Sequence, residues 1–87
     1  MKSVFTKEYE QLLARLIHAR KDAALTQQEL AQRLGRIQSF VSKYERGERR
    51  LDVIEFIHVA HAIGVNAADL VATIEKELIS RKAQKSE

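Results

Sequence analysis

Apolar residues recur along this 87-residue chain in steps of three and four, separated by short polar breaks. Such spacing is typical of amphipathic helices, in which residues one turn apart share a face. The chain has no proline, and its three glycines each follow an apolar-periodic stretch, as helix-ending glycines do. No stretch alternates convincingly as a strand would. The pattern therefore predicts an all-α fold of five short helices.

Local start signals place these helices. The spacing of a capping box occurs twice, at Thr26 with Glu29 and at Asp52 with Glu55. In a capping box, each of the two side chains accepts a hydrogen bond from the backbone N–H of the other residue. Asn66 followed by Asp69 gives a third start signal. The expected helices are residues 7–22, 27–34 and 38–46, a fourth that begins after Asp52, and a fifth that begins at Asn66.

Length and composition limit the domain organisation. Eighty-seven residues suit one domain, which we expect to span residues 1–80, with a frayed tail at 81–87. The chain contains no cysteine, which excludes disulfides, cysteine-based zinc sites and thiol nucleophiles. We find neither the apolar core of a signal peptide nor an apolar run of the ~20 residues that span a membrane. These features lead us to expect a cytoplasmic protein with no membrane partner.

The charge is distributed unevenly. The net charge of +3 is mild, but residues 33–50 hold six basic residues against two acidic ones, a net of +4. Residues 51–79 hold five acidic residues against one lysine, a net of −4. One part of the chain is therefore expected to attract a polyanion, and the other to repel it.

Only Gly35, Arg36 and Ile37 separate the second predicted helix from the third. Two short helices joined by a turn of three or four residues that contains glycine are typical of a helix-turn-helix. Placed at ~100° per residue, the third helix has two opposed faces. Its inward face carries Phe40, Val41 and Tyr44. Its outward face carries Gln38, Ser39, Ser42, Lys43 and Arg46.

The outward face suits nucleic-acid recognition. A glutamine can pair bidentately with adenine, a lysine can donate to guanine, and serine can bond to bases or phosphates. A face that only solvates the helix would more often carry Glu/Lys pairs four residues apart, yet no acidic residue lies near the centre of this one.

The segment "LTQQELAQRLGRIQSFVSKYERG", with "HVAHAIGV" further along, resembles the helix-turn-helix of the XRE family of phage Cro and cI repressor-like proteins. The resemblance covers roughly residues 16–70. It implies a lambda-repressor-like five-helix domain of bacterial or phage origin that binds double-stranded DNA, usually as a homodimer. The implied function is a sequence-specific transcriptional regulator that needs no cofactor.

The resemblance also implies residue roles. Arg20 and Glu45 match a buried ion pair that joins the first and third helices, a structural role. The third helix becomes the recognition helix in the major groove, and residues around it hold the DNA backbone. The base-reading residues would be Gln38, Ser39, Ser42 and Lys43. The backbone contacts would be Gln27, Gln28, Arg36, Arg46, Arg49 and Arg50.

Three positions depart from the family pattern. Ala24 stands where glycine commonly ends the first helix, so either a left-handed alanine costs of order 1 kcal/mol or the turn is built differently. Ile37 precedes the third helix and cannot cap it; we expect partial burial, with a thymine-methyl contact as the alternative. Ile54 occupies a commonly polar position, where partial burial is expected and a partner surface is the alternative.

The predicted fifth helix extends beyond what so small a core needs. Leu78 and Ile79, with Ile54 as a further candidate, are therefore expected to form a twofold dimer contact. An alternative function is an antitoxin-type or other protein-interaction module, whose C-terminal helix holds a protein partner while DNA binding is secondary.

An enzyme or metalloprotein is a third class, which the sequence does not favour. Glu55, His58 and His61 recur at three-residue spacing, but this spacing is common by chance and no cysteine joins them. Nucleophilic catalysis by Ser39 or Ser42 is not supported, because neither serine has an evident histidine base. The sequence also contains no glycine-rich loop of the kind that binds phosphate. We therefore assign no catalytic residue, no metal site and no cofactor.

Overall fold

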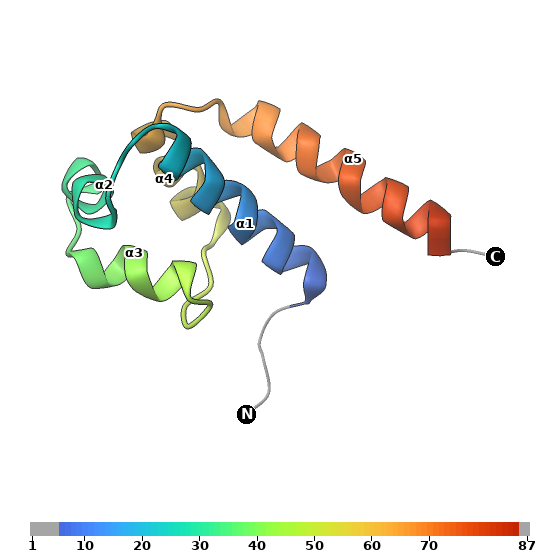
Figure 1. Ribbon diagram of the computed structural model, residues 1–87, viewed down its shortest axis with the longest axis horizontal. Helices are drawn as coiled ribbons and strands as arrows, with labels where there is room; N and C mark the ends of the chain where they lie inside the picture. The colour runs from blue at the N-terminus through green and yellow to red at the C-terminus, as the bar shows by residue number, and fades with distance from the viewer. Residues whose placement is uncertain (1–5, 86–87) are drawn as a thin grey trace.

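The computed structural model describes the backbone of residues 6–85 and the side chains of residues 6–80. Its described residues form helices and no strands, which confirms the all-α prediction (Figure 1). The helices are α1 (Lys7–Asp22), α2 (Gln27–Leu34), α3 (Gln38–Glu45), α4 (Val53–Ile63) and α5 (Ala67–Lys85). The predicted spans of α1 and α2 agree with the structure, and α3 ends one residue earlier than predicted.

Side chains cap the starts of α2, α4 and α5, as their start signals predicted. The Thr26 hydroxyl accepts from the Glu29 N–H at 3.0 Å, and the Glu29 carboxylate accepts from the Thr26 N–H at 2.9 Å. Asp52 and Glu55 form the same reciprocal pair at the start of α4. The Asn66 side chain accepts from the backbone N–H of Asp69 at the start of α5. These local bonds fix where the helices begin.

Left-handed residues lie where two of these helices end. Gly35 and Gly64 have φ of 69° and 99°, and their N–H groups close the ends of α2 and α4. Ala24, between α1 and α2, has φ of 58°, so the left-handed alternative for this residue is the correct one. An alanine in this conformation brings its Cβ close to backbone oxygen, which a glycine avoids.

The hydrophobic core lies between α1, α2, α3 and α4, and α5 covers one side of it. Its most enclosed large side chains are those of Leu16, Leu30, Val41, Tyr44 and Val59. Burial raises the pKa of the Tyr44 phenol above its ordinary range. The predicted apolar faces therefore meet in one core.

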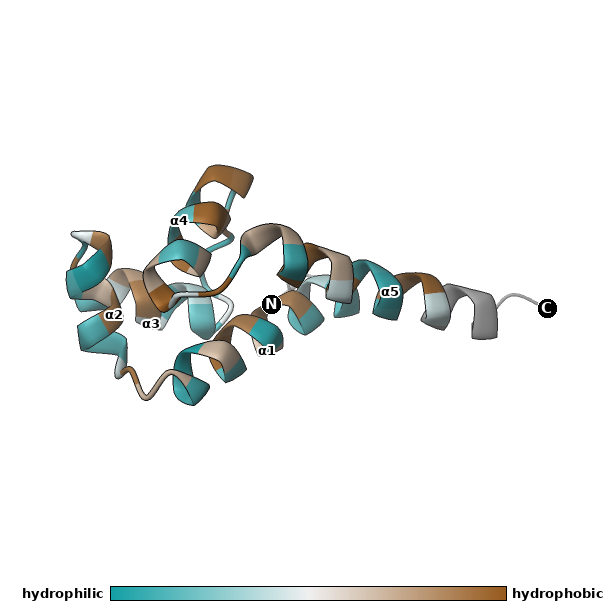
Figure 2. Ribbon diagram, turned by 90° about the horizontal axis from the view of Figure 1, so that it is seen from above, coloured by the Kyte–Doolittle hydropathy of each residue, from teal (hydrophilic) through white to brown (hydrophobic). Residues whose placement is uncertain are grey.

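The fifth helix continues beyond the rest of the fold, as Figure 1 shows. It is helical to Lys85, although the sequence predicted a frayed tail from residue 81 onward. Glu77 joins it to α1 through an ion pair with Arg15 and a long contact from Gln11. In Figure 2, α5 and α4 diverge from their connection toward different sides of the molecule.

Candidate nucleic-acid interface

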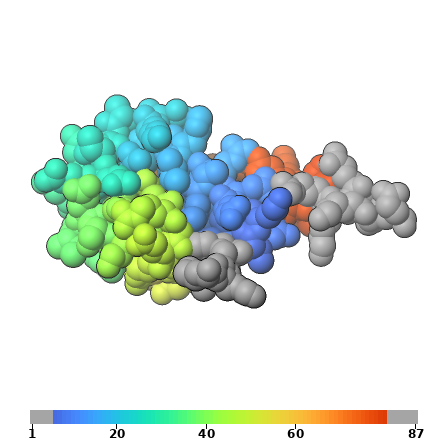
Figure 3. All heavy atoms as spheres, turned by 60° about the horizontal axis from the view of Figure 1, so that its bottom comes forward, coloured from blue at the N-terminus to red at the C-terminus, as the bar shows by residue number. Residues whose placement is uncertain are grey.

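The turn between α2 and α3 is held by backbone hydrogen bonds. The N–H of Arg36 donates to the carbonyl of Ala31 at 2.9 Å, and the N–H of Gly35 donates to the carbonyl of Gln32 at 3.1 Å. Figure 3 shows α2 (teal), α3 (green) and the loop after α3 (yellow-green) side by side on one face of the molecule. The helix pair predicted from the sequence is thus present in the fold.

The two faces of α3 are separated as predicted. Phe40, Val41 and Tyr44 are buried, and the rings of Phe40 and Tyr44 meet edge to face at 5.6 Å between centroids. The polar side of the helix is turned toward solvent. Gln38, Ser39, Lys43 and Arg46 are exposed, and Ser42 is half-buried. The helix is therefore anchored on one side and presents four exposed polar side chains on the other.

Arg20 and Glu45, for which the resemblance implied an ion pair, lie in contact between α1 and α3. The Arg20 Nε and Nη2 atoms donate to the two carboxylate oxygens of Glu45 at 2.7 and 3.0 Å, and Nη1 donates to the carbonyl of Leu25 at 2.8 Å. The hydrogen bond that Arg20 donates to Glu45 raises the pKa of Arg20. The two side chains are 9% and 6% exposed. Removing one partner alone would leave a nearly buried charge, at a typical cost of ~3–5 kcal/mol.

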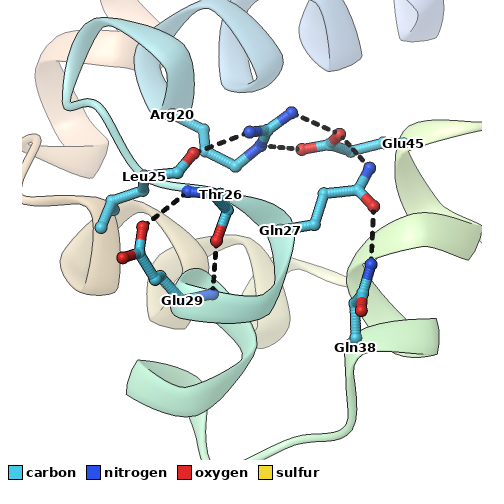
Figure 4. A network of polar contacts seen from close by, with 7 residues as sticks. All are labelled: Arg20, Leu25, Thr26, Gln27, Glu29, Gln38 and Glu45. Atoms are coloured by element: carbon cyan, nitrogen blue, oxygen red, sulfur yellow. Dashed lines mark hydrogen bonds and ion pairs between the residues drawn. The ribbon is translucent and has the colours of Figure 1, made fainter.

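Figure 4 shows that a chain of glutamine amides continues from this ion pair to the start of α3. The Nε2 of Gln27 donates to Oε1 of Glu45 at 2.9 Å. The Nε2 of Gln38 then donates to Oε1 of Gln27 at 3.4 Å. The sequence predicted Gln27 as a phosphate contact and gave no sign of these partners, because Glu45 lies 18 residues away. Gln28, its neighbour, is exposed.

The arginines predicted to contact the DNA backbone already have partners within the protein. Arg46 donates to the carboxylate of Glu48 and to the hydroxyl of Ser42. Arg49 donates twice to Glu55. Two further arginine side chains make cation–π contacts, because the face of an aromatic ring attracts a cation. The guanidinium of Arg36 lies 3.9 Å from the Phe40 ring centroid, and that of Arg50 lies 4.2 Å from that of Tyr9.

These pairs change the acidity of the carboxylates. Hydrogen bonds from the Arg49 side chain and the Asp52 backbone lower the pKa of Glu55 to about 2. The hydrogen bond from Arg46 lowers the pKa of Glu48. Both carboxylates are therefore ionised at neutral pH, and a phosphate that approaches either arginine meets a competing anion.

Two predictions of partial burial are wrong. Ile37 is 74% exposed, and Ile54 is 56% exposed. Ile37 occupies the N-cap position of α3 with an extended backbone. No side chain caps α3, as the apolar residue there implied. Ile54 lies near the start of α4, beside the exposed Val53.

Within residues 6–80 we find no cluster of three metal-ligating side chains, so Glu55, His58 and His61 do not come together as a site. In the described part of the chain no single helix is long and apolar enough to cross a membrane. The helices Val53–Ile63 and Ala67–Ser80 reach that length and composition only together, across a bend of 113°.

Comparisons with known proteins agree with this geometry. A family model described as helix-turn-helix matches residues 16–70. A solved XRE-family like protein from Pseudomonas syringae pv. tomato str. DC3000 superimposes with a TM-score of 0.81 at 51% identity, covering 82% of this chain and 87% of that one. The chain belongs to the XRE family of helix-turn-helix proteins.

Two further proteins extend this XRE-family assignment. An uncharacterized HTH-type transcriptional regulator, y4dJ, from Sinorhizobium fredii (strain NBRC 101917 / NGR234) is 37% identical over 57 residues, 66% of this chain and 74% of its own. The structure of the clp gene regulator ClgR from Corynebacterium glutamicum has a TM-score of 0.70 at 28% identity, covering 90% of this chain and 83% of that one. The resemblance found in the sequence and the five-helix fold are confirmed, and the family is one of DNA-binding transcriptional regulators.

Proposed function

We propose that this XRE-family protein is a sequence-specific regulator of transcription that binds double-stranded DNA as a homodimer, with α3 in the major groove. The observation that carries the proposal is the division of α3 into a buried apolar face and an exposed polar one. A helix docked in the major groove needs both faces, one to fix its position and one to contact base edges.

Base reading is assigned to Gln38, Ser39, Ser42 and Lys43. Gln38 opens the helix, where residues come closest to the floor of the groove in this motif. Its amide suits adenine, while Lys43 suits the acceptors of guanine. The exposed Ile37 adds an apolar contact beside Gln38, and we assign it to a thymine methyl group.

Backbone contacts are assigned to the residues that flank α3. The start of α2 offers free backbone N–H groups together with the side chains of Gln27 and Gln28, an arrangement that favours phosphate. Four arginines surround the recognition helix with positive charge. Their ion pairs within the protein lie at the surface, where such pairs contribute little stability, so contacts with phosphate can replace them. These are Arg36, Arg46, Arg49 and Arg50.

A homodimer would present two recognition helices ~34 Å apart, one turn of DNA, on a near-palindromic site. Two exposed apolar surfaces are available for the contact, one at Ile54 on α4 and one at Ile79 on α5 beside the half-buried Leu78. We favour α5, because a helix that continues beyond its fold gains little stability in water without a packing partner.

Selection of binding sites from random DNA, followed by affinity measurements over a range of salt, tests the proposal. We expect a near-palindromic consensus and an affinity that falls steeply with salt, as phosphate contacts require. Equal affinity for selected and random DNA would contradict sequence-specific binding. A steep salt dependence with no consensus would leave only a non-specific DNA-binding protein.

A further inference from the structure

We infer that Phe40 is a positioning residue for DNA binding: its ring holds the guanidinium groups of Arg36 and Arg49 together beside α3, so that both contact one short stretch of the DNA backbone. The inference rests on the proposed function, which assigns both arginines to backbone phosphate. It gives a residue of the hydrophobic core a role in binding in addition to its role in the fold.

The two arginines come from opposite ends of the recognition helix. Arg36 lies in the turn before α3, and Arg49 lies in the loop after it. The guanidinium carbon of Arg36 lies over the Phe40 ring, 3.9 Å from its centroid, and that of Arg49 lies over the same ring at 5.0 Å. Both distances are within the ~6 Å at which an aromatic ring attracts a cation. One ring therefore contacts two positively charged groups from separate segments of the chain.

The ring is anchored, whereas the groups over it reach the surface. Phe40 is 6% exposed, and its ring packs edge to face against that of Tyr44. Arg36 is exposed and Arg49 is half-buried. Attraction to the face of a ring is electrostatic and uses no particular N–H group, so an arginine held in this way can still donate to phosphate.

Glu55 already places an anion beside these two arginines. Its carboxylate oxygens accept from Nη1 and Nη2 of Arg49 at 2.9 and 2.7 Å. Hydrogen bonds from Arg49 and from the Asp52 backbone lower the pKa of Glu55 most, and the positive charge of Arg36 adds to this effect. Arg36, Phe40 and Glu55 also line one small pocket. The cluster is therefore suited to a pair of anionic oxygen atoms, which a phosphate group also presents.

Holding the arginines in advance should strengthen binding. An arginine side chain loses rotamer freedom when it is fixed on a phosphate, which opposes association. The Phe40 ring restricts both side chains before DNA arrives, so less freedom is lost on binding. An aliphatic side chain would fill the same space in the core but would not attract the cations. Because phosphate groups are the same at every site, the gain should apply to all DNA sequences alike.

Phe40→Leu tests the inference, because leucine stays apolar but has no aromatic face. We expect the affinities for selected and for random DNA to fall by the same several-fold factor, with the base preferences unchanged. Phe56→Leu is the matched control in the core, since Phe56 is also 6% exposed, and it should leave both affinities unchanged. Circular dichroism and urea unfolding check that the variants are folded.

Three results of this comparison would overturn the inference. One is an unchanged affinity for folded Phe40→Leu, and another is an equal fall for Phe56→Leu. The third is a loss confined to selected DNA, because Phe40 would then position the base-reading face of α3 and not the arginines.

Double-mutant cycles show whether Phe40 acts through the two arginines. In a background with Arg36→Gln and Arg49→Gln, Phe40→Leu should cause no further loss of affinity, because no guanidinium remains over the ring. In an Arg50→Gln background the full loss should remain, since the Arg50 guanidinium lies over the Tyr9 ring. A full loss in the first background would overturn the inference.

Phe40→trifluorophenylalanine covers the case in which Phe40→Leu does not fold. Fluorine withdraws electron density from the face of the ring and so weakens its attraction for cations, while the shape of the ring changes little. The affinity should fall here as well, and remain unchanged for the same substitution at Phe56. An unchanged affinity, or tighter binding because the ring competes with phosphate, would overturn the inference alone. If Arg36→Gln with Arg49→Gln keeps the wild-type affinity, the proposed backbone contacts fail together with it.

Discussion

The guanidinium of Arg49 donates two hydrogen bonds to the carboxylate of Glu55, from Nη1 to Oε1 at 2.9 Å and from Nη2 to Oε2 at 2.7 Å. Arg49 belongs to the loop after the recognition helix, and Glu55 belongs to the capping box of α4. The same carboxylate accepts from the backbone N–H of Asp52. One acidic side chain therefore caps a helix and holds a cation that we assign to the DNA backbone.

Replacing Glu55 with glutamine should release Arg49 for phosphate. Glutamine also fits a capping box, so α4 keeps its start signal. We expect higher affinity for all DNA sequences alike and a salt dependence steeper by up to about one unit of slope. Fluorescence anisotropy titrations at several salt concentrations measure both.

Asp69→Asn is the matched control for this change, since it also removes one negative charge at the third residue of a helix, but on α5. A gain of the same size in both variants would assign the effect to net charge. Weaker binding by a folded Glu55→Gln variant would mean that Glu55 orients Arg49 toward DNA instead of competing for it.

Ala24→Gly should stabilise the fold by up to ~1 kcal/mol, because glycine adopts a left-handed φ without the steric cost that alanine carries. Ala23, the neighbouring residue, has an ordinary φ of −82° and serves as the control. Urea unfolding should show a gain for Ala24→Gly and no gain for Ala23→Gly. Equal changes in the free energy of unfolding at both positions would mean that the left-handed conformation of Ala24 carries no steric cost.

Ile37→Ser should separate stability from recognition at the start of α3. Serine can accept from the free N–H groups that Ile37 leaves uncapped, worth roughly 0.5–2 kcal/mol. The same change removes the apolar side chain assigned to a thymine methyl. We expect a more stable protein with less preference for thymine at one position, measured by chemical unfolding and by site selection.

Ile37→Ala completes this experiment, since alanine neither caps the helix nor reaches as far. It should lose the thymine preference without the gain in stability. If Ile37→Ala selects the same sites as the wild type, the exposed isoleucine does not read a base.

The dimer contact can be located with two charged substitutions. Light scattering of the wild type at micromolar concentration should give a dimer, and Ile79→Glu should give a monomer. Ile54→Glu should leave the dimer intact if α5 forms the contact. The opposite result would move the contact to α4, and a monomeric wild type without DNA would argue against a preformed dimer.

The sequence predicted the helices well because their signals are local. The capping boxes at Thr26 and Asp52 lie within four residues, and periodicity alone separated the two faces of α3. Pairings across the fold were not predictable in this way. The contact between Gln27 and Glu45 joins two helices and depends on how they pack.

The exposure of Ile37 was missed for a related reason. Isoleucine is usually buried in folded proteins, so its position in the sequence favours partial burial. In the structure the residue lies at an extended N-cap position and is 74% exposed, so its apolar character alone did not predict its burial. The family resemblance supplied the Arg20–Glu45 pair, which no spacing in the sequence indicates.

Base reading by Gln38 is the central claim, and one comparison tests it most directly. The affinities of the wild type, Gln38→Ala and the control Gln32→Ala are measured for a selected site and for its single-base-pair variants. The account predicts that Gln38→Ala alone loses discrimination at one base pair, by ~1–3 kcal/mol, while binding to random DNA stays the same. Retention of the wild-type preferences by Gln38→Ala, or the same loss in Gln32→Ala, would contradict it.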